Sequence, residues 1–176
     1  MSDENSSVAL PMLWIDADAC PSLVRDVVYK AAKRMNCKVT VVANQPMYVP
    51  VSPRIKQITV TSGANEADDR IVEWMEAGDI VITSDIPLAA RVVDQEGIAI
   101  GHRGEVFDDD TVHSRLATRD MMDQFRSAGM ETGGPKPFDK RDVQQFANAL
   151  DRTMVAQIRQ RERQHRRGQP PEEAGR

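Results

Sequence analysis

The sequence predicts an α/β fold: a three-layer, Rossmann-like domain with a parallel sheet of four to five strands and an appended C-terminal helical pair. Two observations predict this class. Short runs rich in β-branched residues alternate with segments whose apolar residues recur every three or four positions. The strand-like runs are almost wholly apolar, which is typical of parallel strands that helices cover on both faces.

The expected strands and helices alternate along the first hundred residues. The strands are expected over residues 12–15, 38–42, 57–60, 79–83 and 98–100. Helical spacing of apolar residues is found over residues 23–35, 67–75 and 88–93. Between the second and third strands, residues 44–53 carry three prolines and are too few for a full helix, so an irregular crossover is expected there.

Two longer helices are expected after residue 100. The first spans about residues 111–128, with its inward side formed by Val112, Leu116, Met122 and Phe125. The second spans about residues 139–165, and a Gly-Gly-Pro turn at 133–135 is expected to join the two as a pair.

The chain divides into three parts by composition. Residues 1–11 are expected to be a flexible N-terminal extension, and residues 12–155 to be the α/β domain with its C-terminal helices. Residues 156–176 are expected to be a basic helix end followed by a disordered tail.

The composition bounds the classes of partner. The 176 residues, 40% of them hydrophobic, are sufficient for one core. The net charge of −4 argues against binding of nucleic acid through overall charge, so an anionic partner has to meet a local basic patch. Cys20 and Cys37 form no CxxC pair, and with three scattered histidines they make no zinc site. The polar start and the lack of a long apolar run predict a cytoplasmic protein without a membrane span. The sequence carries no signal of oligomeric state.

Acidic residues stand at the predicted ends of strands and starts of helices. Asp16 and Asp18 end the first strand, Asp68 and Asp69 open a helix, and Asp85 follows the fourth strand. In open α/β sheets, sites form beyond the carboxyl ends of the strands, where the strand order reverses. If the first strand lies beside the fourth, these acids converge there. Grouped carboxylates repel one another, and their oxygens suit Mg²⁺ or Mn²⁺.

Helix capping is the competing interpretation of these acids. Asp85 precedes Ile86-Pro87 as an N-cap residue would, and Asn65 with Asp68 resembles a weak capping box. For any one acid the two interpretations are equally good. Asp16 fits capping least well because it ends a strand, and three acids converging on one point favour the metal site.

Four segments carry a resemblance to a known family. They are Asp16-Ala-Asp-Ala-Cys-Pro21, Gly63-Ala-Asn-Glu-Ala-Asp-Asp69, Gly78-Asp-Ile-Val-Ile-Thr-Ser-Asp-Ile-Pro-Leu-Ala89 and Gly133-Gly-Pro135. Together they resemble the YaiI/YqxD family over about residues 12–155. That family consists of uncharacterised bacterial proteins similar to PIN-domain nucleases, whose acids bind divalent metal to cleave RNA. The resemblance therefore implies a PIN-like fold.

The resemblance also implies roles by position. The first PIN acid corresponds to Asp16, the middle acid to Asp68, and the acid after the fourth strand to Asp85, with Thr83 or Ser84 beside it as polar support. Asp18 and Asp69 are further metal-ligand candidates. The chain departs from the family at two positions, with Asn65 in place of a common aspartate and Val143 in place of an arginine.

Other polar residues are candidates for binding a substrate. Asn44 follows the second strand and Arg103 follows the fifth, so both are expected along the carboxyl-end rim, together with Ser84. The basic end supplies Arg159, Arg163 and Arg166 as candidates for phosphate contacts. The alternative for all of these is an ordinary exposed polar position. His113 is expected at the surface, and Cys20 is expected to be a small buried residue.

These patterns favour a divalent-metal-dependent nuclease that hydrolyses phosphodiester bonds, with single-stranded RNA as the substrate. One alternative is a non-catalytic PIN-like module that binds RNA or a protein. A second is an aspartate-based phosphatase with Asp16 as nucleophile and Asp18 as acid, but Ala19, Cys20 and Pro21 fit that motif poorly. No P-loop, GxGxxG or nucleophile elbow is present in the sequence.

Overall fold

The computed structural model describes residues 8–61, 63, 65–134 and 136–168. The elements follow in the order β1 (Leu13–Asp16), α1 (Ser22–Met35), β2 (Val39–Ala43), β3 (Ile55–Thr59), α2 (Glu66–Trp74), β4 (Ile80–Ile82), α3 (Ile86–Asp94), β5 (Ile98–Ile100), β6 (Val106–Phe107), α4 (Asp109–Ser127) and α5 (Lys140–Gly168). Each of the five predicted strands is confirmed to within two residues at either end. The connection from β2 to β3 has no helix, as its prolines predicted.

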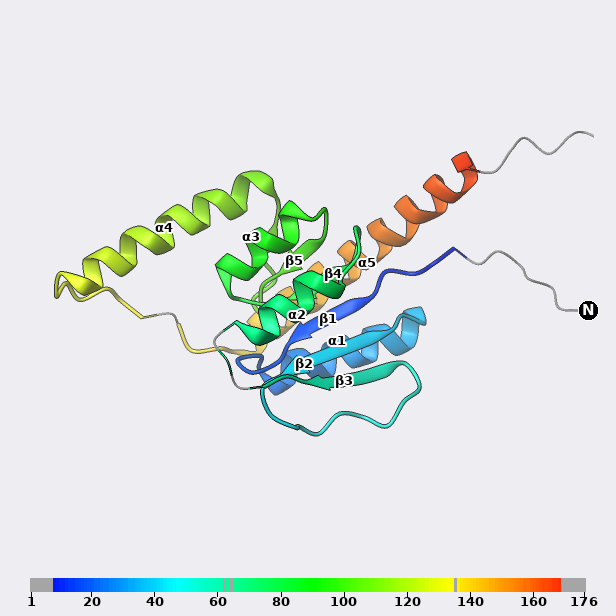
Figure 1. Cartoon of the computed structure of the whole chain (residues 1–176), viewed down its shortest axis with the longest axis horizontal. Coiled ribbons are helices and arrows are strands. Elements are labelled where there is room, and N and C mark those ends of the chain that lie inside the picture. Colours follow the sequence, from blue (N-terminus) through cyan, green and yellow to red (C-terminus); the bar gives the residue numbers. More distant parts are fainter. Residues whose placement is uncertain (1–7, 62, 64, 135, 169–176) are drawn as a thin grey trace, which may run out of the picture.

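The sheet has the order β3-β2-β1-β4-β5-β6 in the described residues (Figure 1). The central strand β1 pairs in parallel with β2 on one side and with β4 on the other, which confirms the predicted neighbours and the reversal of strand order beside β1. The strand β6 was not predicted. It is two residues long and antiparallel to β5, too short to show an alternating pattern in the sequence.

Helices cover both faces of the sheet and complete three layers. On one face, Val24 and Val28 of α1 and Phe146, Leu150 and Met154 of α5 share one buried cluster with the strands. The other face carries a second buried cluster, which contains residues of α2, α3 and the beginning of α4. The predicted α/β class with three layers is therefore confirmed.

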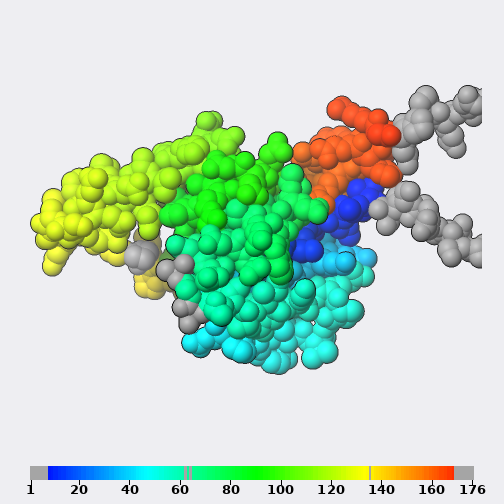
Figure 2. All heavy atoms as spheres, in the orientation of Figure 1, coloured from blue at the N-terminus to red at the C-terminus, as the bar shows by residue number. Residues whose placement is uncertain are grey.

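The two predicted C-terminal helices are confirmed, and they lie on opposite faces of the sheet. Val112 and Leu116 of α4 join the cluster of α2 and α3, whereas α5 packs beside α1 on the opposite face. The second half of α4 projects beyond the body (Figure 2), and Met122 and Phe125, which were expected to face inward, are 36% and 39% exposed. The apolar spacing continues past Leu116, but no neighbouring helix remains for it to meet. Pro135 of the predicted turn lies outside the described residues.

A buried carboxylate lies at the edge of the sheet formed by the amino ends of β1 and β4. Asp79 is 4% exposed and accepts hydrogen bonds from the backbone N–H groups of Met12 and Glu76, both at 3.0 Å. The indole N–H of Trp14 donates to it at 3.1 Å. Its charge is balanced by the guanidinium of Arg161, 3.0 Å away.

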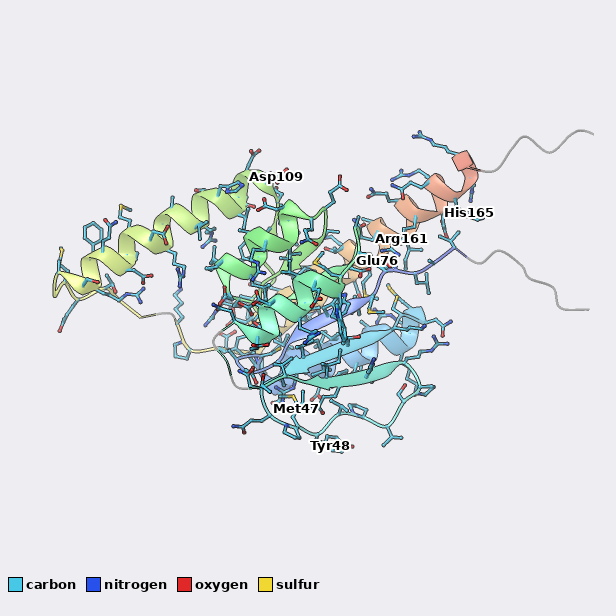
Figure 3. The ribbon with its side chains drawn as sticks, in the orientation of Figure 1. Met47, Tyr48, Glu76, Asp109, Arg161 and His165 are labelled. Carbon is cyan, nitrogen blue, oxygen red and sulfur yellow. The ribbon has the colours of Figure 1, made fainter. Side chains whose placement is uncertain are left out.

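Arg161 also fastens the segment that precedes β1 (Figure 3). Its guanidinium donates to the backbone carbonyls of Ala9 and Leu10 in that segment, and to that of Ala77 before β4. The far part of α5 is thus attached to the amino edge of the sheet. Of the predicted N-terminal extension and C-terminal tail, residues 1–7 and 169–176 lie outside the described residues.

Both cysteines are free and buried, in agreement with the expectation for Cys20. Burial raises the pKa of the Cys20 thiol to about 12, so the thiolate needed for nucleophilic attack does not form near neutral pH. Among the described helices, none has the length and apolar character to cross a membrane.

Candidate metal centre at the carboxyl edge of the sheet

Asp16 ends β1 at the carboxyl edge, and a buried threonine fixes one of its oxygens. The hydroxyl of Thr83 donates to Asp16 Oδ2 at 2.9 Å and accepts from the backbone N–H of Asp85 at 3.0 Å. Thr83 is fully buried, so this hydroxyl has little freedom to change partners. One side chain therefore connects the end of β1 to the end of β4, which agrees with the predicted supporting role of Thr83 or Ser84.

Asp85 caps helix α3. Its Oδ1 accepts the backbone N–H of Leu88 at 3.0 Å, which confirms the capping interpretation for this residue. Its Oδ2 has no hydrogen-bond partner among the described residues, and the side chain is exposed. Capping uses one oxygen and leaves the other available to a cation, so the two interpretations are compatible at Asp85.

Asp68 lies in the first turn of α2 and is half-buried. The predicted capping box with Asn65 is wrong. Asn65 has a left-handed backbone with φ of 71°, and its side chain makes no capping hydrogen bond. Asp68 is therefore not explained as part of a reciprocal cap.

Mutual repulsion shows that the three acids lie within electrostatic reach of one another. Burial and, after it, the charges of Asp16 and Asp85 together raise the pKa of Asp68 from 3.8 to about 6, against the opposing effect of Arg91. Burial also raises the pKa of Asp16, the Thr83 hydrogen bond lowers it, and Asp85 and Asp18 raise it. The fold thus brings together acidic residues from three separate segments. Their repulsion lowers the stability of the folded state.

The two flanking acids have protein partners. Asp18 is exposed, and both of its oxygens accept the backbone N–H of Asn44, at 2.9 and 3.1 Å. Asp69 forms an ion pair with Arg91 at 2.8 Å. Their carboxylates are therefore partly compensated without a metal ion, in contrast to that of Asp68.

Two of the three rim candidates, Ser84 and Arg103, are also engaged within the protein, whereas Asn44 Oδ1 is buried without a hydrogen-bond partner among the described residues. The hydroxyl of Ser84 accepts the backbone N–H of His102 at 3.0 Å. Arg103 forms an ion pair with Asp142 at 2.7 Å and donates to the carbonyl of Lys136, which fastens the start of α5 to the loop after β5. The predicted phosphate contact of Arg103 would have to compete with these bonds.

The spacing of the acids indicates how a cation would fit. In the part of the chain that the structure describes, one group of three side chains has its ligand atoms all within 4.8 Å of one another, and it consists of Asp94, Asp109 and His113. The three acids at the carboxyl edge do not form such a group, so at least one pair among their ligand atoms is separated by more than 4.8 Å. They suit a cation that reaches part of its ligands through water, as Mg²⁺ commonly does.

The exposed group was missed in the sequence. His113 was expected to be a surface residue, and it is exposed. Asp109 and His113 are four residues apart on α4, a spacing that places both on one side of a helix and was available from the sequence. Asp94 ends α3 and joins them only through the fold, because α3 packs beside α4.

Comparison with known proteins establishes the family. A family model described as "Uncharacterized BCR, YaiI/YqxD family" matches residues 14–156. The chain belongs to the YaiI/YqxD family. It is 52% identical over 147 residues to a UPF0178 protein of Acinetobacter baylyi, covering 84% of this chain and 95% of the relative. It is 48% identical over 147 residues to one of Bordetella petrii, covering 84% and 98%, and 51% identical over 140 residues to one of Pectobacterium carotovorum, covering 80% and 93%.

The YaiI/YqxD match confirms the resemblance, and the matched region of the chain includes the candidate acids. Asp16, Asp68 and Asp85 all fall within the matched residues, whereas Arg159, Arg163 and Arg166 lie beyond Ala156, the last of them. Neither the family description nor the names of the relatives specify a reaction. The functional argument therefore rests on the chemistry of the acidic edge.

Replacing Asp68 with asparagine is expected to stabilise this member of the YaiI/YqxD family at neutral pH. A carboxyl whose pKa is higher in the folded state binds its proton more tightly there, so its contribution to stability is lost as pH rises from about 4 through about 6. The amide of the variant cannot ionise. We expect Asp68→Asn to raise the free energy of unfolding by about 1 kcal/mol at pH 7.5, less than the full pKa shift implies because water screens a half-buried group.

The measurement is urea unfolding of both proteins in EDTA between pH 4 and pH 7.5. The advantage of the variant should become small at pH 4, where the wild-type carboxyl is protonated in the folded state and partly protonated in the unfolded state. A difference that stays constant across this range would mean that Asp68 carries no such repulsion.

Proposed function

We propose that this protein is a divalent-metal-dependent nuclease that hydrolyses phosphodiester bonds of single-stranded RNA at the carboxyl edge of its sheet. One observation carries the proposal. Asp16, Asp68 and Asp85 come from β1, α2 and the junction of β4 with α3, and they repel one another strongly enough to help raise the pKa of Asp68 to about 6. A cation compensates such repulsion, and the polyanionic backbone of RNA is a substrate that needs one.

The donor atoms fit Mg²⁺ or Mn²⁺. Carboxylate oxygens, without histidine or cysteine among them, are the ligands that these hard cations prefer. Asp16, Asp68 and Asp85 would hold the ion, with Asp18 and Asp69 at the margin. When bound, such an ion neutralises charge on the phosphate and lowers the pKa of a bound water.

The remaining protein groups prepare this site in defined ways. Thr83 restrains Asp16 through the 2.9 Å hydrogen bond and leaves its Oδ1 without a described partner. The helix cap restrains the Asp85 carboxylate in a similar way. Its Oδ1 accepts the Leu88 N–H, and its Oδ2 remains available to a ligand. Asp68 exchanges its proton near pH 6, so the negative charge of the site and its affinity for a cation should rise through that pH.

The test is incubation of purified protein with a 5′-labelled single-stranded RNA in Mg²⁺ or Mn²⁺, in EDTA, and with Asp16→Asn. We expect cleavage with either metal ion, none in EDTA, and none with Asp16→Asn, which excludes a contaminating nuclease. Asp94→Asn is the matched control, because it changes one carboxylate of the exposed Asp94, Asp109 and His113 group and leaves the carboxyl edge intact.

Metal binding provides a second readout. Mn²⁺ should raise the melting temperature of the wild type and of Asp94→Asn more than that of Asp16→Asn. If the protein binds RNA but does not cut it with either metal ion, and if Asp16→Asn changes neither property, the non-catalytic RNA-binding module takes the place of the nuclease.

A further inference from the structure

The solvent side of α5 carries a line of exposed arginines. We call this line the α5 arginine stripe, and it consists of Arg141, Arg152, Arg159, Arg163 and Arg166. Each residue of an α-helix turns by about 100°, so these five positions fall within an arc of about 60°. The buried residues Phe146, Leu150 and Met154 lie on the other side of the helix. The stripe is therefore on the side of α5 opposite its buried residues, and at Arg152 it borders the loop that contains Gly104 and Glu105.

The stripe differs from the arginines that precede α5 because the guanidinium groups of Arg152, Arg159, Arg163 and Arg166 form no hydrogen bond or ion pair in the described residues, while the charge of Arg141 acts on nearby Asp139. Among the described residues that precede α5, every arginine side chain makes an ion pair or a hydrogen bond, and these are Arg25, Arg34, Arg54, Arg70, Arg91, Arg103, Arg115, Arg119 and Arg126. On α5, Arg161 pairs with Asp79. None of the five stripe arginines forms an ion pair with a carboxylate in the described residues.

Acidic residues of α5 do not neutralise the stripe. Asp142 is bound by Arg103, and Asp151 is bound by Arg34. Glu162 lies at the flank of the arc and forms no ion pair with a described residue. Arg159 and Arg163 are four residues apart and Arg163 and Arg166 are three apart, so like charges repel along one side of the helix. An external anion relieves this repulsion.

The stripe connects two opposite edges of the molecule. Its first residues lie at the carboxyl edge, where Asp142 pairs with Arg103 after β5. Farther along, α5 passes the amino edge, where Arg161 pairs with Asp79 before β4 (Figure 3). The 29 residues of α5 span about 43 Å, and its last turns stand clear of the body (Figures 1 and 2). A ligand that follows the stripe therefore begins on the side of the acids and ends on the opposite side.

The composition of this surface selects among anionic partners. None of the exposed large hydrophobic side chains in the described residues belongs to α5. A helix that lies on a membrane needs apolar side chains to insert, and the core of a protein interface is enriched in aromatic residues and depleted in charge. Cationic side chains are sufficient to bind a phosphate backbone. A single line of guanidinium groups is suited to the backbone of a single strand.

We propose that the α5 arginine stripe is a track for the backbone of single-stranded nucleic acid that extends from the acidic edge along α5. The proposal rests on the proposed nuclease function for the identity of the ligand at the acidic edge. From Arg141 to Arg166 the helix rises about 38 Å. A strand stacked as in a duplex advances about 3.4 Å per nucleotide, so about eleven nucleotides span the stripe. The substrate class is therefore a strand of about ten nucleotides or more, rather than a di- or trinucleotide.

The experiment measures binding by fluorescence anisotropy of labelled oligouridylates of 12 and 4 nucleotides, in EDTA, with the full chain. The variant carries Arg152→Gln, Arg159→Gln and Arg163→Gln. We expect it to bind the 12-mer at least tenfold more weakly at 0.1 M salt, with a salt dependence lower by about two in the slope of log K against log salt. Binding of the 4-mer should be weak and should change less than threefold.

The matched control carries Arg115→Gln, Arg119→Gln and Arg126→Gln on α4, which changes the net charge equally at exposed arginines that have ionic partners. It should keep 12-mer binding within threefold of the wild type. Equal losses in the two triple variants, or unchanged binding in the α5 variant, would overturn the track. So would stripe-dependent binding to phosphatidylserine vesicles without binding to the 12-mer. Thermal melting establishes that both variants are folded.

This design separates the track from the nuclease. Because binding is measured in EDTA, loss of cleavage in Asp16→Asn with stripe-dependent binding intact supports both proposals. Stripe-dependent binding by a wild type that never cleaves RNA supports the track and contradicts the nuclease. Cleavage that is equally fast with 4-mers and 12-mers and insensitive to the α5 substitutions supports the nuclease and contradicts the track.

Discussion

The Asp85→Asn variant is expected to cleave single-stranded RNA at least 100-fold more slowly than the wild type at saturating substrate, while its stability stays nearly unchanged. The substituted side chain keeps an oxygen that can accept the Leu88 N–H, and asparagine is as good an N-cap as aspartate, so the free energy of unfolding should change by less than about 0.5 kcal/mol. The lost negative charge removes a metal ligand and therefore transition-state stabilisation. Single-turnover cleavage in Mn²⁺ and urea unfolding measure the two effects separately.

Two further variants complete this test. Asp85→Ala removes the cap as well as the charge, so it should lose the same activity and about 1 kcal/mol of stability. Asp108→Asn is the matched control. Asp108 caps α4 by accepting the N–H of Thr111, and it is not one of the proposed metal ligands. It should cleave at the wild-type rate. If Asp85→Asn also keeps the wild-type rate, Asp85 is only a helix cap.

The Asp79→Ala variant is expected to lose about 3 to 5 kcal/mol of unfolding free energy, the usual effect of removing one partner from a buried ion pair. Alanine would leave the Arg161 guanidinium without its counter-charge and three N–H donors without their acceptor. Urea unfolding at pH 7.5 measures this loss directly.

The exposed pair of Arg34 and Asp151 provides the comparison for Asp79. Its side chains are 58% and 48% exposed, against 16% and 6% for Arg161 and Asp79. Asp151→Ala should therefore lose less than about 1 kcal/mol. A similar loss in Asp79→Ala and Asp151→Ala would show that burial of the Arg161 pair does not contribute to stability.

Local sequence patterns predicted the sheet better than they predicted the packing of the last two helices. Apolar β-branched runs predicted all five parallel strands; β1, β2 and β4 bury both faces, whereas β3 lies at the edge of the sheet and is partly exposed. The helical spacing at Met122 and Phe125 predicted a helix correctly, but spacing does not specify a partner, and α4 extends past the end of α3. The sixth strand forms because Phe107 pairs with Ala99 of β5. A run of two residues is too short for its sequence to predict that pairing.

The sequence predicted which acidic residues lie near one another at the candidate site. It did not predict the hydrogen bonds and ion pairs that hold them. Strand ends and helix starts specified Asp16, Asp68 and Asp85, because parallel strands bring such positions to one edge. The hydrogen bond from Thr83 to Asp16 joins residues 67 positions apart, so it follows from the pairing of β1 with β4. Asp79 and Arg161 are 82 positions apart, and the sequence assigned Asp79 to a strand and Arg161 to a basic run without indicating that they pair.

The packing of α5 against α1 affects how the chain folds during synthesis. Translation releases the chain from its amino end, and β1, the central strand, is among the first elements to leave the ribosome. The cluster around Val24 and Val28 is completed only by Phe146, Leu150 and Met154. The part of the sheet face that α5 covers therefore stays open until nearly the entire chain has emerged. A ribosome-bound fragment that ends before Phe146 should be sensitive to proteases and a target for chaperones, and native protection should arise in one late step.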